Sequence, residues 1–164
     1  MIKPDLLQYE GMLRTKRADG KTLLFDRIRK KWLVLQPEEL VRQLLVTWLV
    51  EAHQYNPRRM SLERGLLFNG LARRYDLLVY DPEMRPFLLA ECKAPAVDLD
   101  AGAARQIALY NMVLQVPYLL LTNGRYLCLY AIDHQEKSFE KLGQVPPYPG
   151  RPPENSQKDK AFFY

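Results

Sequence analysis

The chain has 164 residues, of which 48% are hydrophobic and 26% are charged, and both fractions are ordinary for a soluble globular protein. This length is sufficient for one domain with its own core and too short for two. The longest apolar runs, such as residues 44–50, cannot span a bilayer, and the first residues lack the charged and then apolar leader of a secreted protein. We therefore expect a cytoplasmic protein with no membrane partner.

The polar composition limits the kind of site. The net charge of +5 is compatible with a polyanionic partner, although the basic clusters at residues 16–17, 27–31, 58–59 and 73–74 are equally typical of solvated faces and strand edges. The two cysteines, Cys92 and Cys128, lie in apolar runs without CxxC spacing, and the chain has only two histidines, which argues against zinc. A metal ion would therefore need oxygen ligands, which Mg²⁺ and Mn²⁺ prefer.

The first 36 residues predict short strands. Residues 12–17 and 22–25 flank Asp19-Gly20, a strong hairpin-turn signal, and a third strand is expected at 32–35. Pro37 then opens a helix, which apolar residues at helical spacing extend to about residue 53. Asn56-Pro57 ends it.

The second half alternates strands and one helix. Strands are expected at 60–68, 73–80 and 87–93, with turns at Asn69-Gly70 and Asp81-Pro82. A helix follows over 99–114, then strands at 117–122 and 126–132 and a short one at 138–142. The residues expected on the core face of that helix are Ala104, Ile107, Ala108, Asn111 and Met112.

This order predicts an α/β fold in which helices flank a mixed β-sheet, preceded by an N-terminal β-hairpin. We expect a single domain over residues 1–145, with the hairpin at 12–35 and the core at 37–142. A tail rich in proline and polar residues is expected over 146–164.

Three charged residues are predicted to meet where two neighbouring strands lie side by side. Glu91 and Lys93 flank Cys92 at the end of an apolar strand, so they point to the same face. The tight turn before this strand makes the preceding strand its antiparallel neighbour, which brings Asp76 close to both. From spacing alone, an ion pair of Glu91 with Lys93 beside a turn residue is the commoner structure; a metal-dependent hydrolytic site also fits.

The chemistry of such a site needs these residue types. Asp76 and Glu91, with the backbone carbonyl of Cys92, can bind Mg²⁺, or Mn²⁺ as a substitute. A bound cation polarises a phosphoryl oxygen and lowers the pKa of a bound water. Lys93 can orient that water or stabilise the charge that builds on the phosphate. The pattern predicts metal-assisted hydrolysis of a phosphodiester bond.

Several ordered motifs resemble one nuclease family. Tyr75-Asp76, followed on the next strand by Glu91-Cys92-Lys93, resembles the signature of the PD-(D/E)XK nuclease superfamily, with tyrosine in place of a proline that supplies no ligand. A wider set of segments resembles the N-terminal nuclease domain of type I restriction enzyme R subunits, most closely the small stand-alone proteins that share it. Those segments are 26–32, 37–43, 91–95, 106–111 and 117–124. The resemblance covers about residues 26–142 and implies a restriction-endonuclease-like core.

The resemblance also implies supporting residues. Glu39 matches an acidic position on the first helix that supports the metal site directly or through water, and Glu38 is its rival because one sequence does not fix the register. Gln106 matches a glutamine that lies beside the active centre. The residues expected to contact nucleic acid are Arg73, Arg74 and Tyr110, the last of which lies one helical turn after Gln106.

The expected function is thus a Mg²⁺-dependent endonuclease acting on DNA, in restriction or defence. Its expected partners are DNA and a separate helicase, translocase or specificity subunit, because the sequence contains no motor motif; a homodimer is the expected assembly. Two alternatives stay open. One is a module that keeps the nuclease fold and binds nucleic acid or protein without cutting, and the other is a metabolic or structural α/β domain.

Overall fold

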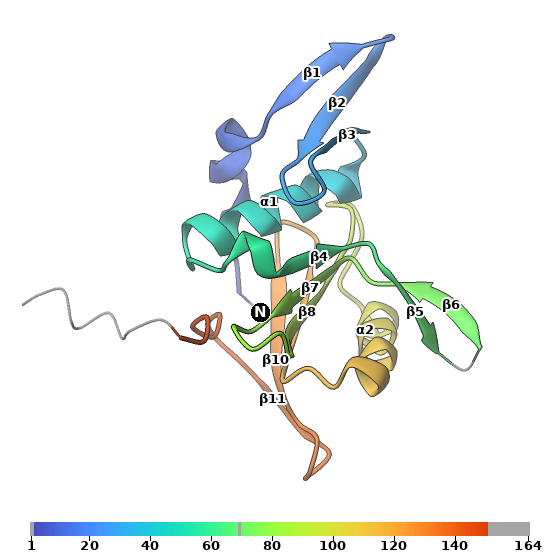
Figure 1. Ribbon diagram of the computed structural model, residues 1–164, viewed down its shortest axis with the longest axis vertical. Helices are drawn as coiled ribbons and strands as arrows, with labels where there is room; N and C mark the ends of the chain where they lie inside the picture. Colours follow the sequence, from blue (N-terminus) through green and yellow to red (C-terminus); the bar gives the residue numbers. More distant parts are fainter. Residues whose placement is uncertain (1, 69, 151–164) are drawn as a thin grey trace, which may run out of the picture.

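The computed structural model describes residues 2–68 and 70–150, apart from the side chains of residues 66, 68, 71 and 73. Asn69 of a predicted turn, the side chain of Arg73 and the tail segment 151–164 therefore lie outside the described residues. Within the described part of the chain, the strands form sheets of three, six and two strands, accompanied by two α-helices (Figure 1). None of the helices in this part is long and apolar enough to cross a membrane.

The six-stranded sheet forms the centre of the fold. Its strands run in the order β11-β10-β9-β8-β7-β4, and β8 and β9 are parallel while the other neighbours are antiparallel. Parallel neighbours need a crossover, which α2 (Ala101–Leu114) supplies. The strands are β4 (Met60–Leu62), β7 (Leu77–Tyr80), β8 (Pro86–Cys92), β9 (Tyr118–Thr122), β10 (Leu127–Asp133) and β11 (Ser138–Lys141). The predicted mixed sheet flanked by helices is confirmed.

The two helices cover opposite faces of this sheet. Side chains alternate along a strand, and in the central strands both alternating sets are apolar and buried. Leu77 and Leu88 pack in one core cluster with α1 (Pro37–Glu51), whereas Leu78 and Leu89 pack in another with α2. Since Glu91 follows Leu89 by two residues, its side chain is on the α2 side.

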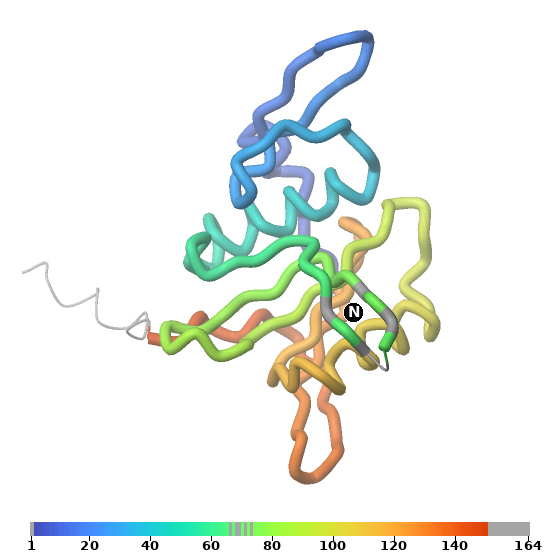
Figure 2. The backbone as a smooth tube through the Cα atoms, turned by 45° about the vertical axis from the view of Figure 1, so that its right-hand side comes forward, coloured from blue at the N-terminus to red at the C-terminus, as the bar shows by residue number. Residues whose placement is uncertain are grey.

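The N-terminal strands form a separate three-stranded antiparallel sheet. It consists of β1 (Thr15–Ala18), β2 (Lys21–Asp26) and β3 (Lys31–Val34), and the β1–β2 hairpin projects from the rest of the molecule (Figures 1 and 2). Asp19 and Gly20 in its turn both have positive φ, as a tight hairpin of this kind requires. The predicted hairpin and third strand are confirmed, but β1 begins at residue 15 because Leu6–Met12 forms a 3-10 helix.

The strands predicted at 60–68 and 73–80 are each broken in the middle. Glu63 has a left-handed backbone (φ 48°) that turns the chain after β4, and β5 (Gly65–Phe68) pairs with β6 (Leu71–Arg74) as a separate hairpin. The breaks lie side by side, because the Glu63 N–H donates to the Asp76 carbonyl at 3.1 Å. Asp76 therefore lies just before β7 rather than inside a strand.

The face predicted for α2 is partly wrong. Ile107 and Asn111 are buried as expected, but Ala108 and Met112 are exposed, and Ala103 and Tyr110 are buried in their place. The helix begins at Ala101, two residues later than expected, since the Asp100 carboxylate caps it by accepting from the Ala103 N–H at 2.9 Å.

The segment just after residue 145 contributes to the core, although we expected the tail to begin there. The Tyr55 hydroxyl donates to the Pro146 carbonyl at 2.8 Å, and the Tyr148 hydroxyl donates to the Tyr80 carbonyl at 2.9 Å. The Tyr148 ring is buried against Tyr55 and Phe87, with ring centroids 5.2 and 6.2 Å away. The proline and polar residues of this stretch therefore do not prevent packing, because the buried Tyr148 ring holds the segment against the core.

Replacement of Tyr148 tests this packing. Tyr148→Ala removes a buried ring and is expected to lower the free energy of unfolding by about 3 kcal/mol. Tyr148→Phe keeps the ring and loses only the bond to the Tyr80 carbonyl, so about 1 kcal/mol is expected. Urea unfolding followed by circular dichroism gives both values, and equal, small losses in the two variants would contradict a core role for residues 146–148.

Candidate active site

Asp76, Glu91 and Lys93 gather at the end of β8. The Cys92 N–H donates to Asp76 Oδ2 at 2.6 Å, in the position where β7 would have continued the ladder, and Lys93 Nζ donates to Glu91 Oε1 at 2.8 Å. Asp76 and Glu91 are both buried, whereas the Lys93 side chain is 20% exposed. The break between β6 and β7 is what lets the Asp76 side chain reach β8.

Gln106 of α2 joins Glu91 to Lys93. Its Nε2 donates to Glu91 Oε1 at 2.5 Å, and its Oε1 accepts from Lys93 Nζ at 3.2 Å. The Tyr110 hydroxyl, one turn later, accepts from the same Nε2 at 3.2 Å. The Tyr110 ring is buried, so its hydroxyl holds Gln106 in place while its ring presents no open face for a base to stack on.

Arg42 of α1 is the counter-charge of Asp76. Its Nη2 donates to Asp76 Oδ1 at 2.8 Å, and its Nη1 pairs with Glu39. The residue is only 3% exposed. Burial works to lower the pKa of Arg42, but the charges of Asp76 and Glu39 outweigh burial and raise the pKa, so the guanidinium stays charged.

Glu39 lies inside a buried network of ion pairs. It accepts from Arg29 at 3.1 Å and from Gln43 at 2.9 Å, besides its pair with Arg42. Arg29 in turn pairs with Asp26 and Glu63. Glu39 is therefore connected to Asp76 through the Arg42 guanidinium, and its carboxylate accepts hydrogen bonds from Arg29, Arg42 and Gln43.

Glu38 is on the side of α1 that faces the site charges. Its side chain is half exposed, and its Oε1 is 3.4 Å from Arg42 Nη2. Burial and the charge of Asp76 raise the pKa of Glu38, while Arg42 and Lys93 work to lower it. Glu38 thus lies in the electrostatic field of Asp76 and Lys93, whereas the Glu39 carboxylate pairs with Arg29 and Arg42.

The carboxylates of this site repel one another. Burial and the charge of Asp76 raise the pKa of Glu91 to about 7, although Lys93 works in the opposite direction. Burial works to lower the pKa of Lys93, but its hydrogen bond to Glu91 outweighs this effect and raises the pKa. Burial raises the pKa of the Cys92 thiol well above its usual value, so Cys92 offers the site its backbone and no thiolate.

The donor set fits a hard divalent cation with several bound waters. Among the described residues, no three acidic, histidine or cysteine side chains are grouped as a metal site, so an ion would depend on Asp76, Glu91 and a backbone oxygen. Both hydrogen bonds to Glu91 go to Oε1, which leaves Oε2 open. The Cys92 carbonyl points to the same edge of β8 as the N–H that binds Asp76. Mg²⁺ is commonly held by one or two carboxylates plus water.

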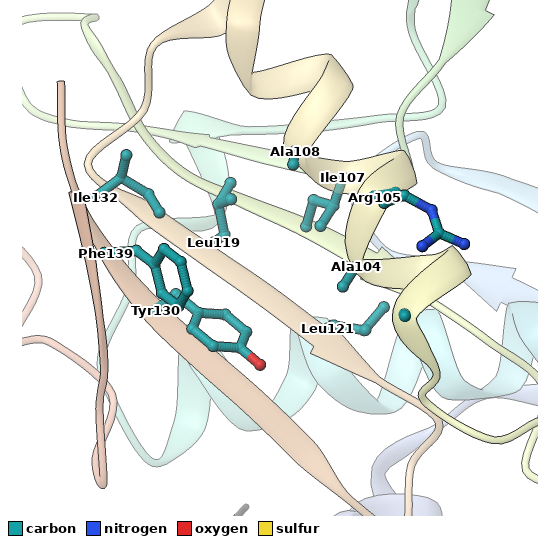
Figure 3. Close-up of a pocket in the computed structure, with 10 residues that line it drawn as sticks. Ala104, Arg105, Ile107, Ala108, Leu119, Leu121, Tyr130, Ile132 and Phe139 are labelled. Carbon is teal, nitrogen blue, oxygen red and sulfur yellow. The ribbon is translucent and has the colours of Figure 1, made fainter. Parts of the chain in front are cut away.

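A hollow with a mainly apolar lining lies elsewhere on the molecule. About 370 Å³ of space opens between α2 and the strands β9–β11, lined by residues that include Ala104, Ile107, Leu121, Tyr130 and Phe139 (Figure 3). None of the site carboxylates lines it.

Arg74, a predicted nucleic-acid contact, has a side chain that is 67% exposed. Its Nη2 is 3.3 Å from Glu63 Oε1, at the edge of the ion-pair network.

Comparison with known proteins gives the family. Residues 37–146 match the family described as the type I restriction enzyme R protein N terminus. The chain belongs to this family. A solved fragment of a protein assigned as an HsdR subunit of a type I restriction enzyme, from Vibrio vulnificus YJ016, is 17% identical with a TM-score of 0.49; the match covers 68% of this chain and 24% of that one. No curated protein matches.

The R protein N-terminal segment contains the whole candidate site. It begins with Pro37 at the start of α1 and includes Glu38, Arg42, Asp76 and the strand that carries Glu91 and Lys93. The N-terminal sheet β1–β3, with Arg29, precedes the matched segment. The family assignment therefore says nothing of the N-terminal sheet, although its last turn contacts Glu39.

Sequence reasoning did not identify Arg42 as part of the R protein site. Its signal was present, because Arg42 follows Glu38 and Glu39 by four and three residues, the spacings that bring charged side chains together on one helix. Nothing local in the sequence indicates that Asp76, 34 positions later, occupies the other side of the same guanidinium.

Substitution of the two neighbouring glutamates separates their roles in this R protein domain. Glu39→Gln leaves Arg29 and Arg42 short of one buried counter-charge and is expected to lower the free energy of unfolding by about 3 kcal/mol. Glu38→Gln, at a half-exposed position, is expected to change it by less than about 1 kcal/mol. Thermal or urea unfolding measures both; equal losses would contradict the assignment of Glu39 to the buried network.

Proposed function

We propose that this chain is a nuclease that hydrolyses DNA phosphodiester bonds with the help of a divalent cation, Mg²⁺ or its substitute Mn²⁺. The observation that carries the proposal is the cluster of Asp76, Glu91, Lys93 and Gln106 at the end of β8, in a chain of the R protein N-terminal family. Two carboxylates that can hold a cation, beside a protonated lysine, suit metal-assisted hydrolysis of a phosphodiester.

The residues have distinct roles in the proposed reaction. Asp76, Glu91 and the Cys92 carbonyl hold the cation. When bound, the cation polarises a phosphoryl oxygen and makes a bound water more acidic. Lys93 keeps its proton, because its pKa is raised, and its ammonium stabilises the negative charge that grows on the phosphate as water adds and the bond to the leaving oxygen breaks.

Arg42 and Gln106 are positioning residues in this mechanism. Arg42 Nη2 and the Cys92 N–H each occupy one oxygen of Asp76, which fixes the orientation of the carboxylate. Each carboxylate oxygen has two lone pairs, so both oxygens keep one for a further partner. Gln106 similarly fixes Glu91 through Oε1 alone. Both acidic groups are thus held in place before any substrate binds, which saves reorganisation during the reaction.

The proposal extends to the setting of the reaction. A cytoplasmic protein that takes part in restriction or defence, with a separate helicase, translocase or specificity subunit, agrees with a family named after one protein of a restriction enzyme. We also propose that Arg74, which pairs with Glu63 at the edge of the ion-pair network, and its sequence neighbour Arg73 contact the DNA backbone.

A second candidate function is binding without cleavage. One observation favours it: Arg42 already neutralises Asp76, which weakens the attraction of this carboxylate for a cation. Plasmid DNA incubated with Mg²⁺ and, separately, with Mn²⁺ distinguishes the two functions. Nicked or linear products support the nuclease, whereas a mobility shift without any strand break supports the binding module.

Replacement of Lys93 tests the assigned chemistry. Lys93→Ala is expected to reduce metal-dependent cleavage at least 100-fold, because the charge on the phosphate loses its stabilising partner. Lys141→Ala, which removes the same charge from an exposed position on β11, is the matched control and should cleave at the full rate. Unfolding curves verify that both variants fold, and an active Lys93→Ala protein would exclude this role.

Crystals soaked in Mn²⁺ test the proposed ligands. An anomalous peak is expected between Asp76, Glu91 and the Cys92 carbonyl, since Mn²⁺ scatters anomalously and accepts the same oxygen ligands. Asp76→Asn removes the negative charge of one of the two carboxylate ligands and should lose the peak. A peak that persists in this variant, or one that lies away from β8, would refute the ligand set.

A further inference from the structure

The net positive charge of the chain lies in the segment that forms its N-terminal sheet. Residues 14–34 contain eight of the 24 basic residues and two of the 19 acidic residues, so this stretch has a net charge of +6, whereas the whole chain has +5. The other 143 residues together therefore carry a net charge of −1. An element with this excess of positive charge provides a local attraction for a polyanion.

Most of these cations are available to a partner. Arg27 pairs with Glu51, and Arg29 pairs with the buried network. The other six form no ion pair among the described residues, and each is exposed; they are Arg14, Lys16, Arg17, Lys21, Lys30 and Lys31. Exposed cations without counter-charges in the protein are the groups that gain most from contact with phosphates, since no internal pair is lost.

The pairing register divides the sheet into two faces. Leu24 and Asp26 are buried, so the face that contains them packs against the molecule. The residues on the other face follow from the cross-strand partners: Lys16 opposite Leu23, Ala18 opposite Lys21, Leu23 opposite Val34, and Phe25 opposite Trp32. This second set is exposed or half-buried, and we call it the outer face.

Two cations are held on aromatic rings of the outer face: Lys16, and Arg14, which precedes Lys16 by two residues and whose carbonyl accepts from the Phe25 N–H. Phe25 and Trp32 contact each other, with centroids 5.2 Å apart. The Arg14 guanidinium lies 4.4 Å from the Phe25 ring centroid, and Lys16 Nζ lies 4.4 Å from that of Trp32. Cation–π contacts restrict long side chains and hold their charges over the sheet. Because cations already cover these rings, the face is built to present charge to phosphates and offers bases little room for stacking.

We infer that the outer face of the N-terminal sheet, with Arg14, Lys16 and Lys21, binds the phosphate backbone of duplex DNA. The shape agrees with this partner, since the β1–β2 hairpin projects from the molecule (Figure 1) and a two-stranded ribbon fits the major groove of B-form DNA. The inference rests on the proposed nuclease function for its choice of DNA. It gives the proposed nuclease a DNA-binding surface outside the segment that matches the family.

The test is a binding titration in EDTA, so that the result does not depend on cleavage. A 20-base-pair duplex is titrated with the full chain and with the triple variant Arg14→Gln, Lys16→Gln, Lys21→Gln, at several salt concentrations. The variant is expected to bind at least tenfold more weakly at about 100 mM salt. The slope of log K against log salt should become shallower by about 2 to 3, because each lost phosphate contact removes about 0.9 from it.

The matched control removes one arginine and two lysines from other exposed positions. Arg58→Gln, Lys137→Gln and Lys141→Gln lower the net charge by the same three units, and this variant should keep at least half of the wild-type affinity and the wild-type salt slope. Unfolding curves of both variants verify that each is folded. Equal losses in the two triple variants, or no loss in the first, would overturn the inference.

Two further outcomes bear on the partner and on the proposed function. A 20-nucleotide single strand that binds more tightly than the duplex, with loss in the same variant, would overturn the choice of duplex. Binding by the outer face combined with an absence of cleavage under Mg²⁺ and Mn²⁺ would leave this inference standing and refute the nuclease. Metal-dependent cleavage by the wild-type chain, combined with an outer-face variant that binds DNA as tightly as the wild type, would refute this inference and leave the nuclease standing.

Discussion

The guanidinium of Arg42 is buried between α1 and the entry of β7, and the acidic groups around it are buried because it is there. An unpaired buried carboxylate or arginine would cost several kcal/mol. Here the costs offset one another, because Arg42 pairs with Asp76 on one side and with Glu39 on the other. Glu39 then shares Arg29 with Asp26 and Glu63. The network thereby links the N-terminal sheet, the first helix and two strands of the central sheet.

This arrangement also decides the asymmetry of the candidate site. The two carboxylates at the end of β8 are balanced by different cations: Asp76 by the buried Arg42, and Glu91 by the partly exposed Lys93. Of the two cations, Lys93 is the more exposed, with 20% of its side chain accessible against 4% for Arg42. Burial of Glu91, with the charge of Asp76 nearby, raises its pKa to about 7, although Lys93 works in the opposite direction. In the reaction proposed above, a divalent cation would add positive charge beside both carboxylates.

The sequence predicts the elements well where local signals and the tertiary structure agree. Asp19-Gly20 forms the turn of the N-terminal hairpin and Pro37 is the first residue of α1, as the sequence predicts. Both signals depend only on residues adjacent in the sequence. The breaks at Glu63 and Tyr75-Asp76 were not predicted, since the flanking residues have ordinary strand propensity and the break depends on hydrogen bonds between distant backbone groups. Side-chain alternation correctly joined Glu91 to Lys93 on one face. It could not show that Arg42 would meet Asp76, nor choose between Glu38 and Glu39, because a helix places neighbouring residues about 100° apart and one sequence does not give its rotation.

Arg29 makes the N-terminal sheet more than an appendage. It follows β2 directly, in a turn whose backbone N–H groups at Ile28 and Arg29 are bound by the buried Asp26 carboxylate. From this fixed turn, the Arg29 guanidinium reaches Glu39, and Glu39 is bound to the same Arg42 that holds Asp76. A continuous series of ion pairs, from Arg29 through Glu39 and Arg42 to Asp76, therefore connects the base of the sheet to the site. Ion pairs in a buried network leave little freedom for one element to rotate against another. A DNA backbone bound to the outer face, as inferred above, would therefore have a defined orientation to Asp76 and Glu91.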